Sequence, residues 1–177
     1  MNRMSQRLWR LTISAMFIAM SVVISIFCKS LLNFAGGLLR ITFENLPILL
    51  AGIALGPATG AVVGLSADLI GYMLSGQAYP LDPLVTLASA LVGIIAGVVS
   101  KYIIKKRGSL QVIVSGAAAH IICSMVIKSV ALYKFYGWAV LVRIPIYAVV
   151  GCLEIILMCL LFKQHGFTKL IEEIDAK

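Results

Sequence analysis

Charged residues are scarce in this sequence. Only 12% of its 177 residues are charged, 61% are apolar, and the mean hydropathy is +1.04. An ordinary soluble protein has roughly 45–50% apolar and about 25% charged residues. A water-soluble fold of this length could not bury so much apolar surface, whereas a lipid bilayer can accept it. We therefore expect a small integral membrane protein that forms a single domain over residues 1–177.

Several chemical motifs are missing as well. No Walker A, HExxH or GxSxG sequence occurs, which argues against ATP hydrolysis by this chain and against two common hydrolase types. Because His and Cys pairs at ligand spacing are absent, we expect no metal and no cofactor. The four cysteines form no CxxC pair and lie in or beside apolar runs, so they read as small buried apolar residues: Cys28, Cys123, Cys152 and Cys159.

Six stretches are apolar enough to be membrane spans, some of them only with help from neighbouring residues. A span needs about 20 mostly apolar residues. The six cover residues 8–32, 44–55, 60–74, 84–104, 110–132 and 140–162. The second is short, so it must tilt, thin the bilayer or begin in a re-entrant loop. The fold class that we predict is all-α, a bundle of six transmembrane helices.

The basic N-terminal residues Met1–Arg10 resemble the start of a signal peptide. No small-residue cleavage site follows cleanly, and the apolar run is long enough to span, so we expect a retained first helix.

The basic residues predict the orientation. With both termini in the cytoplasm, ten basic residues lie inside and five lie outside or in the outer half, as the positive-inside rule favours. The outer five are Lys29, Arg40, Lys128, Lys134 and Arg143. Trp9 and Trp138 then lie at the inner and outer interfaces, where aromatic residues collect. No internal repeat is visible, so an inverted-repeat secondary transporter is not supported.

Small residues at a spacing of four predict close helix packing. The glycine pairs are Gly52 and Gly56, Gly60 and Gly64, and Gly93 and Gly97. Ala15 and Ala19 in the first span have the same spacing, which fits either packing within the bundle or docking of a partner helix.

Ionisable residues inside the predicted spans are costly and usually have a purpose. Asp68 lies midway along the third span, Glu154 in the middle of the sixth, and Lys128 near the outer end of the fifth. They could be internal ion pairs, for example Lys128 with Asp68 or Glu154, or they could face a ligand. His120 reads more simply as a core histidine with a partner.

Aromatic side chains gather on the predicted outer side: Phe34, Phe43, Tyr72, Tyr79, Tyr133, Phe135, Tyr136 and Trp138. An interfacial belt would account for several of them, above all Trp138. Four outer cations, Lys29, Arg40, Lys128 and Arg143, and the deep carboxylate of Asp68 accompany them. Together they predict a binding pocket for a flat, polar, anionic ligand. Aromatic rings would stack on the flat part of the ligand, and cations would bind its acid group.

The sequence from Leu39 to Tyr72 resembles a known family. Leu39-Arg-Ile-Thr-Phe-Glu-Asn-Leu-Pro-Ile48 is followed by Gly52, Gly56-Pro57, Gly60, Gly64, Ala67-Asp68 and Gly71-Tyr72. This pattern is similar to the substrate-binding S components of energy-coupling factor (ECF) vitamin transporters, and most like the folate-specific members. The strongest match covers residues 39–102, and six helices with a short second segment fit the whole length.

The resemblance implies a high-affinity vitamin receptor in the bacterial plasma membrane, and not an enzyme. Its partners would be a transmembrane coupling subunit and two cytoplasmic ATPases, with Ala15 and Ala19 at the place where the family's first helix meets the coupling subunit. The ligand would be folate. Asp68 would accept from the pterin 2-amino and N3–H groups, with the ring between aromatic side chains. The glutamate tail would lie near Lys29, Arg40, Lys128 or Arg143.

Two alternatives stay open. Another vitamin or precursor, such as a thiamine precursor or pantothenate, would suit the same family. A membrane-embedded enzyme would use Asp68 and Glu154 as acid and base, although neither has a partner motif.

Overall fold

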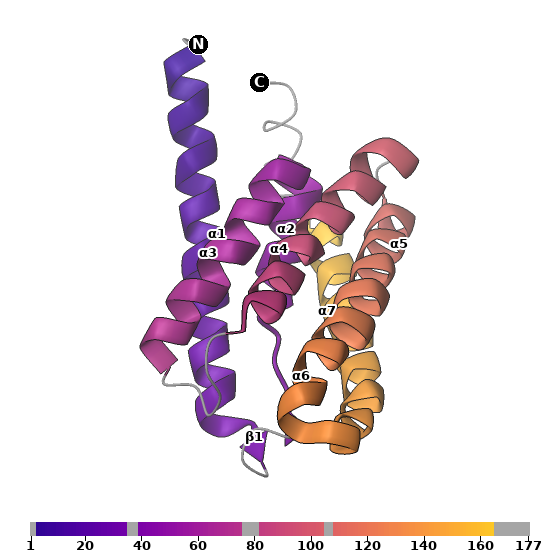
Figure 1. The fold of residues 1–177 in the computed structure, drawn as a ribbon. Helices are drawn as coiled ribbons and strands as arrows, with labels where there is room; N and C mark the ends of the chain where they lie inside the picture. The colour runs from indigo at the N-terminus through magenta and orange to yellow at the C-terminus, as the bar shows by residue number, and fades with distance from the viewer. Residues whose placement is uncertain (1–2, 35–38, 76–81, 105–107, 165–177) are drawn as a thin grey trace.

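A helix of 29 residues, α1 (Arg3–Leu31), runs along one side of the molecule and extends beyond the other helices at its N-terminal end (Figure 1). The structure is a computed structural model that describes residues 3–34, 39–75, 82–104 and 108–164. The later helices are α2 (Asn45–Leu55), α3 (Pro57–Ser75), α4 (Pro83–Val98), α5 (Ser109–Ala119), α6 (Lys128–Tyr136) and α7 (Arg143–Lys163). Two π-helical segments, η2 (Val99–Ile103) and η3 (His120–Ile127), and one 3-10 segment, η4 (Gly137–Val142), continue them.

A short hairpin marks one end of the bundle. Strands β1 (Asn33–Phe34) and β2 (Leu39–Arg40) pair antiparallel, with Asn33 opposite Arg40 and Phe34 opposite Leu39. Figure 1 shows this hairpin at the end opposite the start of α1. We call it the hairpin end. The predicted all-α class is confirmed for the described residues apart from these two strands of two residues each.

Glycine, proline and aspartate residues set the helix boundaries at both ends of the bundle. Gly56 has a φ of 102°, which an L side chain rarely adopts, so α2 stops there and Pro57 opens α3. At the hairpin end, the Asp82 carboxylate accepts a hydrogen bond from the backbone N–H of Leu84, and Pro83 occupies the first turn of α4. This is the usual chemistry of a helix N-terminus.

Four helical stretches in the described residues are long and apolar enough to cross a membrane. They are Arg7–Leu31, Pro57–Leu74, Pro83–Ile103 and the continuous run Ser109–Lys163, and Asn45–Leu55 is a shorter apolar helix. In Figure 1 the last run turns back on itself near η4, so that α7 lies beside α5. The count of six spans and the cytoplasmic placement of both termini stay predictions.

A seam of glycines holds α2, α3 and α4 together. A Cβ atom added to Gly60 would lie 2.7 Å from the backbone oxygen of Gly93, and one added to Gly97 would lie 2.5 Å from the backbone nitrogen of Pro57. A Cβ on Gly52 or Gly64 would also meet backbone atoms of α4. The predicted role of these glycines in close packing is confirmed. Gly56 differs, because its nearest neighbour is the side chain of Lys101.

The core is centred on α2, which is buried at all of its 11 residues. A helix that is apolar all round must be surrounded by protein or lipid. Here protein surrounds it: α1, α3, α4, α5 and α7 all pack against it. The exposed large side chains of the other helices are mostly apolar, as a lipid-facing surface requires.

Candidate functional site

Polar and charged side chains surround one pocket in the hairpin half of the bundle. The space between protein atoms there is about 700 Å³ when the open solvent at its mouth is counted with it. We call it the central pocket. It is lined by Thr42, Glu44, Asn45, Asp68, Tyr72, Asp82, Val85, Thr86, His120, Lys128, Leu132, Arg143, Tyr147 and Val150. These residues come from the starts of α2, α4 and α7, from α3, and from η3 and α6, so chain segments far apart in sequence meet here.

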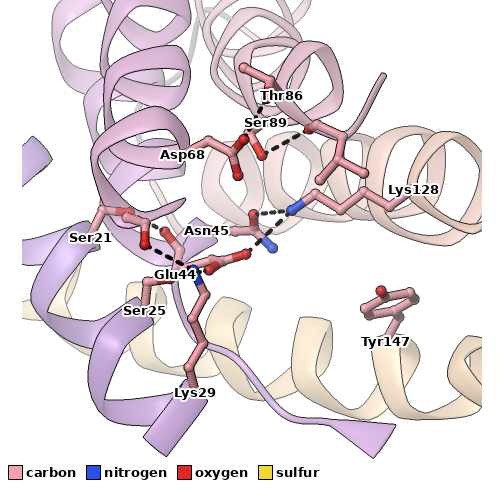
Figure 2. Close-up of polar contacts among 12 residues, drawn as sticks. Ser21, Ser25, Lys29, Glu44, Asn45, Asp68, Thr86, Ser89, Lys128 and Tyr147 are labelled. Carbon is pink, nitrogen blue, oxygen red and sulfur yellow. Dashed lines mark hydrogen bonds and ion pairs between the residues drawn. The ribbon is translucent and has the colours of Figure 1, made fainter. Parts of the chain in front are cut away.

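Asp68 of α3 reaches both the central pocket and a smaller adjoining one of about 190 Å³. Thr86 of α4 donates a hydrogen bond from Oγ1 to Oδ2 of Asp68 at 2.7 Å (Figure 2). A carboxylate has about four acceptor positions, so this one bond fixes the side chain and leaves acceptor positions for a ligand. The binding role of Asp68 stays a prediction.

Lys128 is buried in the pocket and bonded to the start of α2. Its Nζ donates to Oδ1 of Asn45 at 3.2 Å and lies 3.7 Å from Oε1 of Glu44. Glu44 also accepts hydrogen bonds from Ser25 at Oε2 and from Ser21 at its backbone oxygen, both at 2.7 Å. Figure 2 shows the group, which links α1, α2 and α6. The suggested pairing of Lys128 with Asp68 or Glu154 is wrong, because Glu44 takes that place.

Glu154 of α7 is fully buried and has His120 as its partner. Nε2 of His120 lies 2.5 Å from Oε2 of Glu154. The prediction that His120 is a core histidine with a partner is therefore confirmed, and the contact gives Glu154 an internal partner. The imidazole ring also lines the central pocket, which sequence reasoning missed.

Arg143, the first residue of α7, is 3% exposed. Its guanidinium donates a hydrogen bond to the Tyr147 hydroxyl at 3.3 Å and lies 5.1 Å from the ring centroid of Tyr136, within the range of a cation–π contact. These two tyrosines hold the cation at the pocket. A fixed, buried guanidinium is suited to bind a carboxylate through two parallel hydrogen bonds.

Asp82, just before α4, is a buried carboxylate with two partners. Lys134 of α6 lies 2.6 Å from its Oδ2, and the Leu84 N–H donates to its Oδ1 at 2.8 Å. Burial alone would raise the pKa of Asp82, but the hydrogen bonds from Lys134 and from the backbone, together with the lysine charge, hold that pKa below its ordinary value. Asp82 is therefore ionised at neutral pH and joins α4 to α6.

Of the predicted ligand residues, Asp68, Tyr72, Lys128 and Arg143 line the central pocket, and three others do not. Lys29 lies beside it, where its Nζ donates to the backbone oxygen of Gly71 at 3.3 Å. Phe43 is half-buried. Trp138 is 75% exposed, packs edge-on against Tyr133 with ring centroids 5.7 Å apart, and lines a separate apolar groove. Gly137, whose φ is 54°, ends α6 and starts the turn that carries Trp138 away from the pocket.

Two further predicted residues are not described at the level of the side chain. Arg40 lies in β2 with its backbone opposite Asn33. Tyr79 lies outside the described residues. Their binding roles stay predictions.

Sequence reasoning missed Asn45, Thr86 and Tyr147 as pocket residues and gave Glu44 no role in the site. Glu44-Asn45 directly before a short apolar helix was the available signal, because two polar residues there must face protein or ligand when the helix is buried. Among the described residues, no three His, Cys, Asp or Glu side chains gather closely enough to hold a metal ion.

Ala15 and Ala19 lie far from the pocket in sequence and on an exposed face of α1. Phe17, between them, is buried against the bundle. The two alanines therefore do not serve packing within this chain, and the alternative, contact with a partner, stays a prediction.

Comparison with known proteins gives a family and finds solved structures with a similar fold. Residues 9–162 match the family described as "ECF transporter, substrate-specific component". A solved structure, described as the crystal structure of FolT bound with folic acid, is similar with a TM-score of 0.66 and 22% sequence identity. The similarity covers 84% of this chain and 89% of that chain. A search among curated proteins finds no match.

Proposed function

The chain belongs to the family of substrate-specific components of ECF transporters, and on this premise we propose that it is a folate-binding member of that family. The observation that carries the proposal is the composition of the central pocket. A carboxylate, Asp68, shares it with two buried cations, Lys128 and Arg143. The solved FolT structure with a similar fold holds folic acid, a ligand with hydrogen-bond donors on its head group and two carboxylates on its tail.

Each part of folate has a counterpart in this pocket. Asp68 accepts from the 2-amino and N3–H groups of the pterin, and the half-buried ring of Tyr72 lies in the same lining. Arg143 and Lys128 face the glutamate carboxylates, since both are buried cations with hydrogen-bond donors. Lys29, Arg40, Phe43 and Tyr79 belong to the wider set that we propose for the pocket mouth, and Trp138, which lines a separate groove, is not part of it.

The proposal includes partners and topology. We propose one domain over residues 1–177, six spans with both termini in the cytoplasm, and a place in the bacterial plasma membrane. The hairpin end then faces outward and the pocket opens toward the vitamin. A transmembrane coupling subunit and two ATPases of the ECF module supply the energy, and the coupling subunit docks on α1 at Ala15 and Ala19. The chain itself is a binding subunit and not an enzyme.

Identification of a copurifying small molecule tests the ligand. The chain is purified in detergent from cells supplied with folate, and the bound molecule is released and measured by mass spectrometry, followed by titration calorimetry with the compound found. Folate at one molecule per chain supports the proposal. A bound thiamine precursor or pantothenate would leave the family assignment unchanged and show that the ligand is not folate. Conversion of a bound compound by this chain alone would show that the protein is an enzyme.

A pair of ligands tests the assignment of the tail. Arg143→Ala should lower the affinity for folic acid by about tenfold or more, because a hydrogen bond to a charged group contributes about 1.5–3 kcal/mol. A pterin without the glutamate tail should lose little. Lys163→Ala is the matched control, since this exposed cation ends the same helix and is not among the lining residues. Equal losses for both ligands would mean that Arg143 has a structural role.

A further inference from the structure

Asn45, the first residue of α2, brings an amide group to the lining of the central pocket. The residue is only 5% exposed, and its Oδ1 accepts a hydrogen bond from Nζ of Lys128 at 3.2 Å. A lysine ammonium has donors and no acceptor, so the amide oxygen must face it and the amide nitrogen, Nδ2, lies at the other corner of the group. The bond to Lys128 therefore fixes which end of the amide is the donor.

Nδ2 is the end of this amide that the protein does not use. It carries two N–H donors, and neither donates to a residue that the structure describes. Figure 2 shows the bond between Asn45 and Lys128 and draws no contact at the amide nitrogen. Unlike both nitrogens of His120, Nδ2 keeps accessible surface, and the space that Asn45 lines is the central pocket. A donor that faces a pocket without a protein partner is suited to bind an acceptor of the ligand.

Asn45 lies close to two groups that have assigned roles in the proposed function. Its oxygen binds Lys128, which we assign to the glutamate tail. It also follows Glu44 in the chain, and Glu44 lines the smaller adjoining pocket together with Asp68. Asn45 and Asp68 both line the central pocket. The amide is therefore near the carboxylate that accepts from the pterin donors and near a cation that binds the tail.

The pterin ring carries its polar groups in a matching order. The 2-amino and N3–H donors are followed by two neighbouring acceptors, the 4-oxo oxygen and N5, and then by C6, which carries the tail. Resting on the folate-binding function proposed above, we propose that Asn45 is a specificity-determining residue that donates from Nδ2 to the 4-oxo oxygen and N5. Asp68 binds the donors of the ring and Asn45 binds its acceptors, while Lys128 holds the amide in the orientation that this requires.

Two deaza analogues of folic acid test the proposal. Each replaces one ring nitrogen by C–H and keeps the tail and the 2-amino, N3–H and 4-oxo groups. 5-Deazafolic acid lacks the acceptor N5, whereas 8-deazafolic acid keeps N5 and lacks N8. A site that donates to a ligand atom rejects an analogue that cannot accept the bond. By titration calorimetry, the wild-type protein should bind 5-deazafolic acid at least about fivefold more weakly than folic acid, which is roughly 1 kcal/mol, and 8-deazafolic acid within about twofold of it.

Two substitutions of Asn45 separate recognition from structure. Asn45→Asp keeps an oxygen that accepts from Lys128, so the contact between α6 and the start of α2 remains, and it replaces the donor by an acceptor. Asn45→Leu has a similar shape and removes both polar groups. In each variant folic acid should lose at least about threefold more affinity than 5-deazafolic acid, so that the preference between the two ligands largely disappears.

Asp68→Asn is the matched control. Folic acid and 5-deazafolic acid keep the same 2-amino and N3–H groups, so both should weaken by the same factor. Equal binding of the two ligands by the wild type, or an equal loss for both in Asn45→Asp, overturns this inference and leaves folate binding intact. A wild-type preference against 8-deazafolic acid alone also overturns it, because the donor would then face N8. Failure of the wild type to bind folic acid overturns both proposals.

Discussion

Asp68 is a carboxylate inside α3, a helix long and apolar enough to cross a membrane, and its side chain is held by one hydrogen bond from Thr86. Asp68→Asn keeps the size and can still accept from Thr86, but it replaces one acceptor by a donor that faces the ligand's own N–H groups. The affinity for folic acid should fall by at least about 2 kcal/mol, or roughly 30-fold. Titration calorimetry on purified protein measures the change.

Thr86→Val is the control for Asp68, because it removes the positioning bond and leaves the carboxylate. It should weaken binding much less, and the thermal stability of both empty variants should stay close to that of the wild type. An Asp68→Asn variant that binds normally but unfolds early would show that Asp68 is part of the structure and not of the ligand site.

Asp82 predicts how stability depends on pH. Its pKa is lower in the folded protein than its ordinary value of 3.8. The contribution of Asp82 to the free energy of unfolding is therefore complete when the pH lies above its pKa in the unfolded chain. It is lost as the pH falls through its pKa in the folded protein. In detergent, the unfolding temperature should show no Asp82-dependent change from pH 8 to pH 5 and should fall below about pH 4.

Asp82→Asn isolates this effect from the titration of other carboxylates. The variant should have a lower unfolding temperature at pH 7, since the bond to Lys134 loses its charge, and a shallower fall in acid. If wild type and variant lose the same number of degrees between pH 5 and pH 3, Asp82 does not contribute the acid sensitivity.

The glycine seam gives a prediction for whole helices. Gly93→Ala places a Cβ atom against the backbone of Gly60, so α3 and α4 must move apart. Overpacking of this kind costs about 1–3 kcal/mol. Gly71→Ala is the matched control within α3, because its Cβ would lie 3.6 Å from Oγ of Ser25, an ordinary contact.

Thermal unfolding in detergent distinguishes these two substitutions. Gly93→Ala should lower the unfolding temperature clearly. Gly71→Ala should leave it unchanged or raise it, since alanine is favoured over glycine in a helix by up to about 1 kcal/mol. Equal unfolding temperatures of the two variants would mean that α3 and α4 can move apart at the glycine seam without loss of stability.

The exposed face of α1 gives a prediction for assembly. Ala15→Trp should leave folate binding unchanged and abolish capture of the ECF module, because a bulky ring keeps a partner helix at a distance. Met20→Trp is the control, since Met20 is exposed on the same helix about 100° round from Ala19. The check is a pull-down of the module by each variant. Capture at the wild-type yield with Ala15→Trp would refute the docking role.

At the scale of the molecule, the proposed function separates the binding pocket from the source of energy. The sequence contains no nucleotide-binding motif. Proteoliposomes that hold this chain alone should bind folate and should not concentrate it, with or without ATP. Addition of the coupling subunit and the ATPases should start ATP-dependent accumulation, measured with labelled folate. Accumulation by the single chain would contradict this division of work.

Helix positions could be predicted from the sequence because long apolar runs interrupted by glycine and proline have few other interpretations. The fourth and sixth predicted segments, residues 84–104 and 140–162, coincide closely with α4–η2 and α7. The partners of the buried charges could not be predicted. Which face of each helix meets its neighbours depends on packing between segments far apart in the chain. Thus Lys128 pairs with Glu44, and Glu154 pairs with His120.

Only part of the candidate site could be predicted from the sequence. Asp68 and Arg143 stand out because charge in or beside an apolar run is unusual. Thr86 and Tyr147 do not stand out, because threonine and tyrosine are common in such helices, and only the fold shows that they hold those two side chains.

The complete burial of α2 has a consequence for biogenesis. Its 11 residues rise about 16 Å, roughly half of a hydrocarbon core about 30 Å thick. Such a segment is too short to enter the bilayer alone as a stable span. Its surroundings are protein, and α3, α4, α5 and α7 are synthesised after it. The nascent chain must therefore hold α2 at the translocon or the membrane interface until later helices arrive, so this part of the bundle assembles in an order different from that of synthesis.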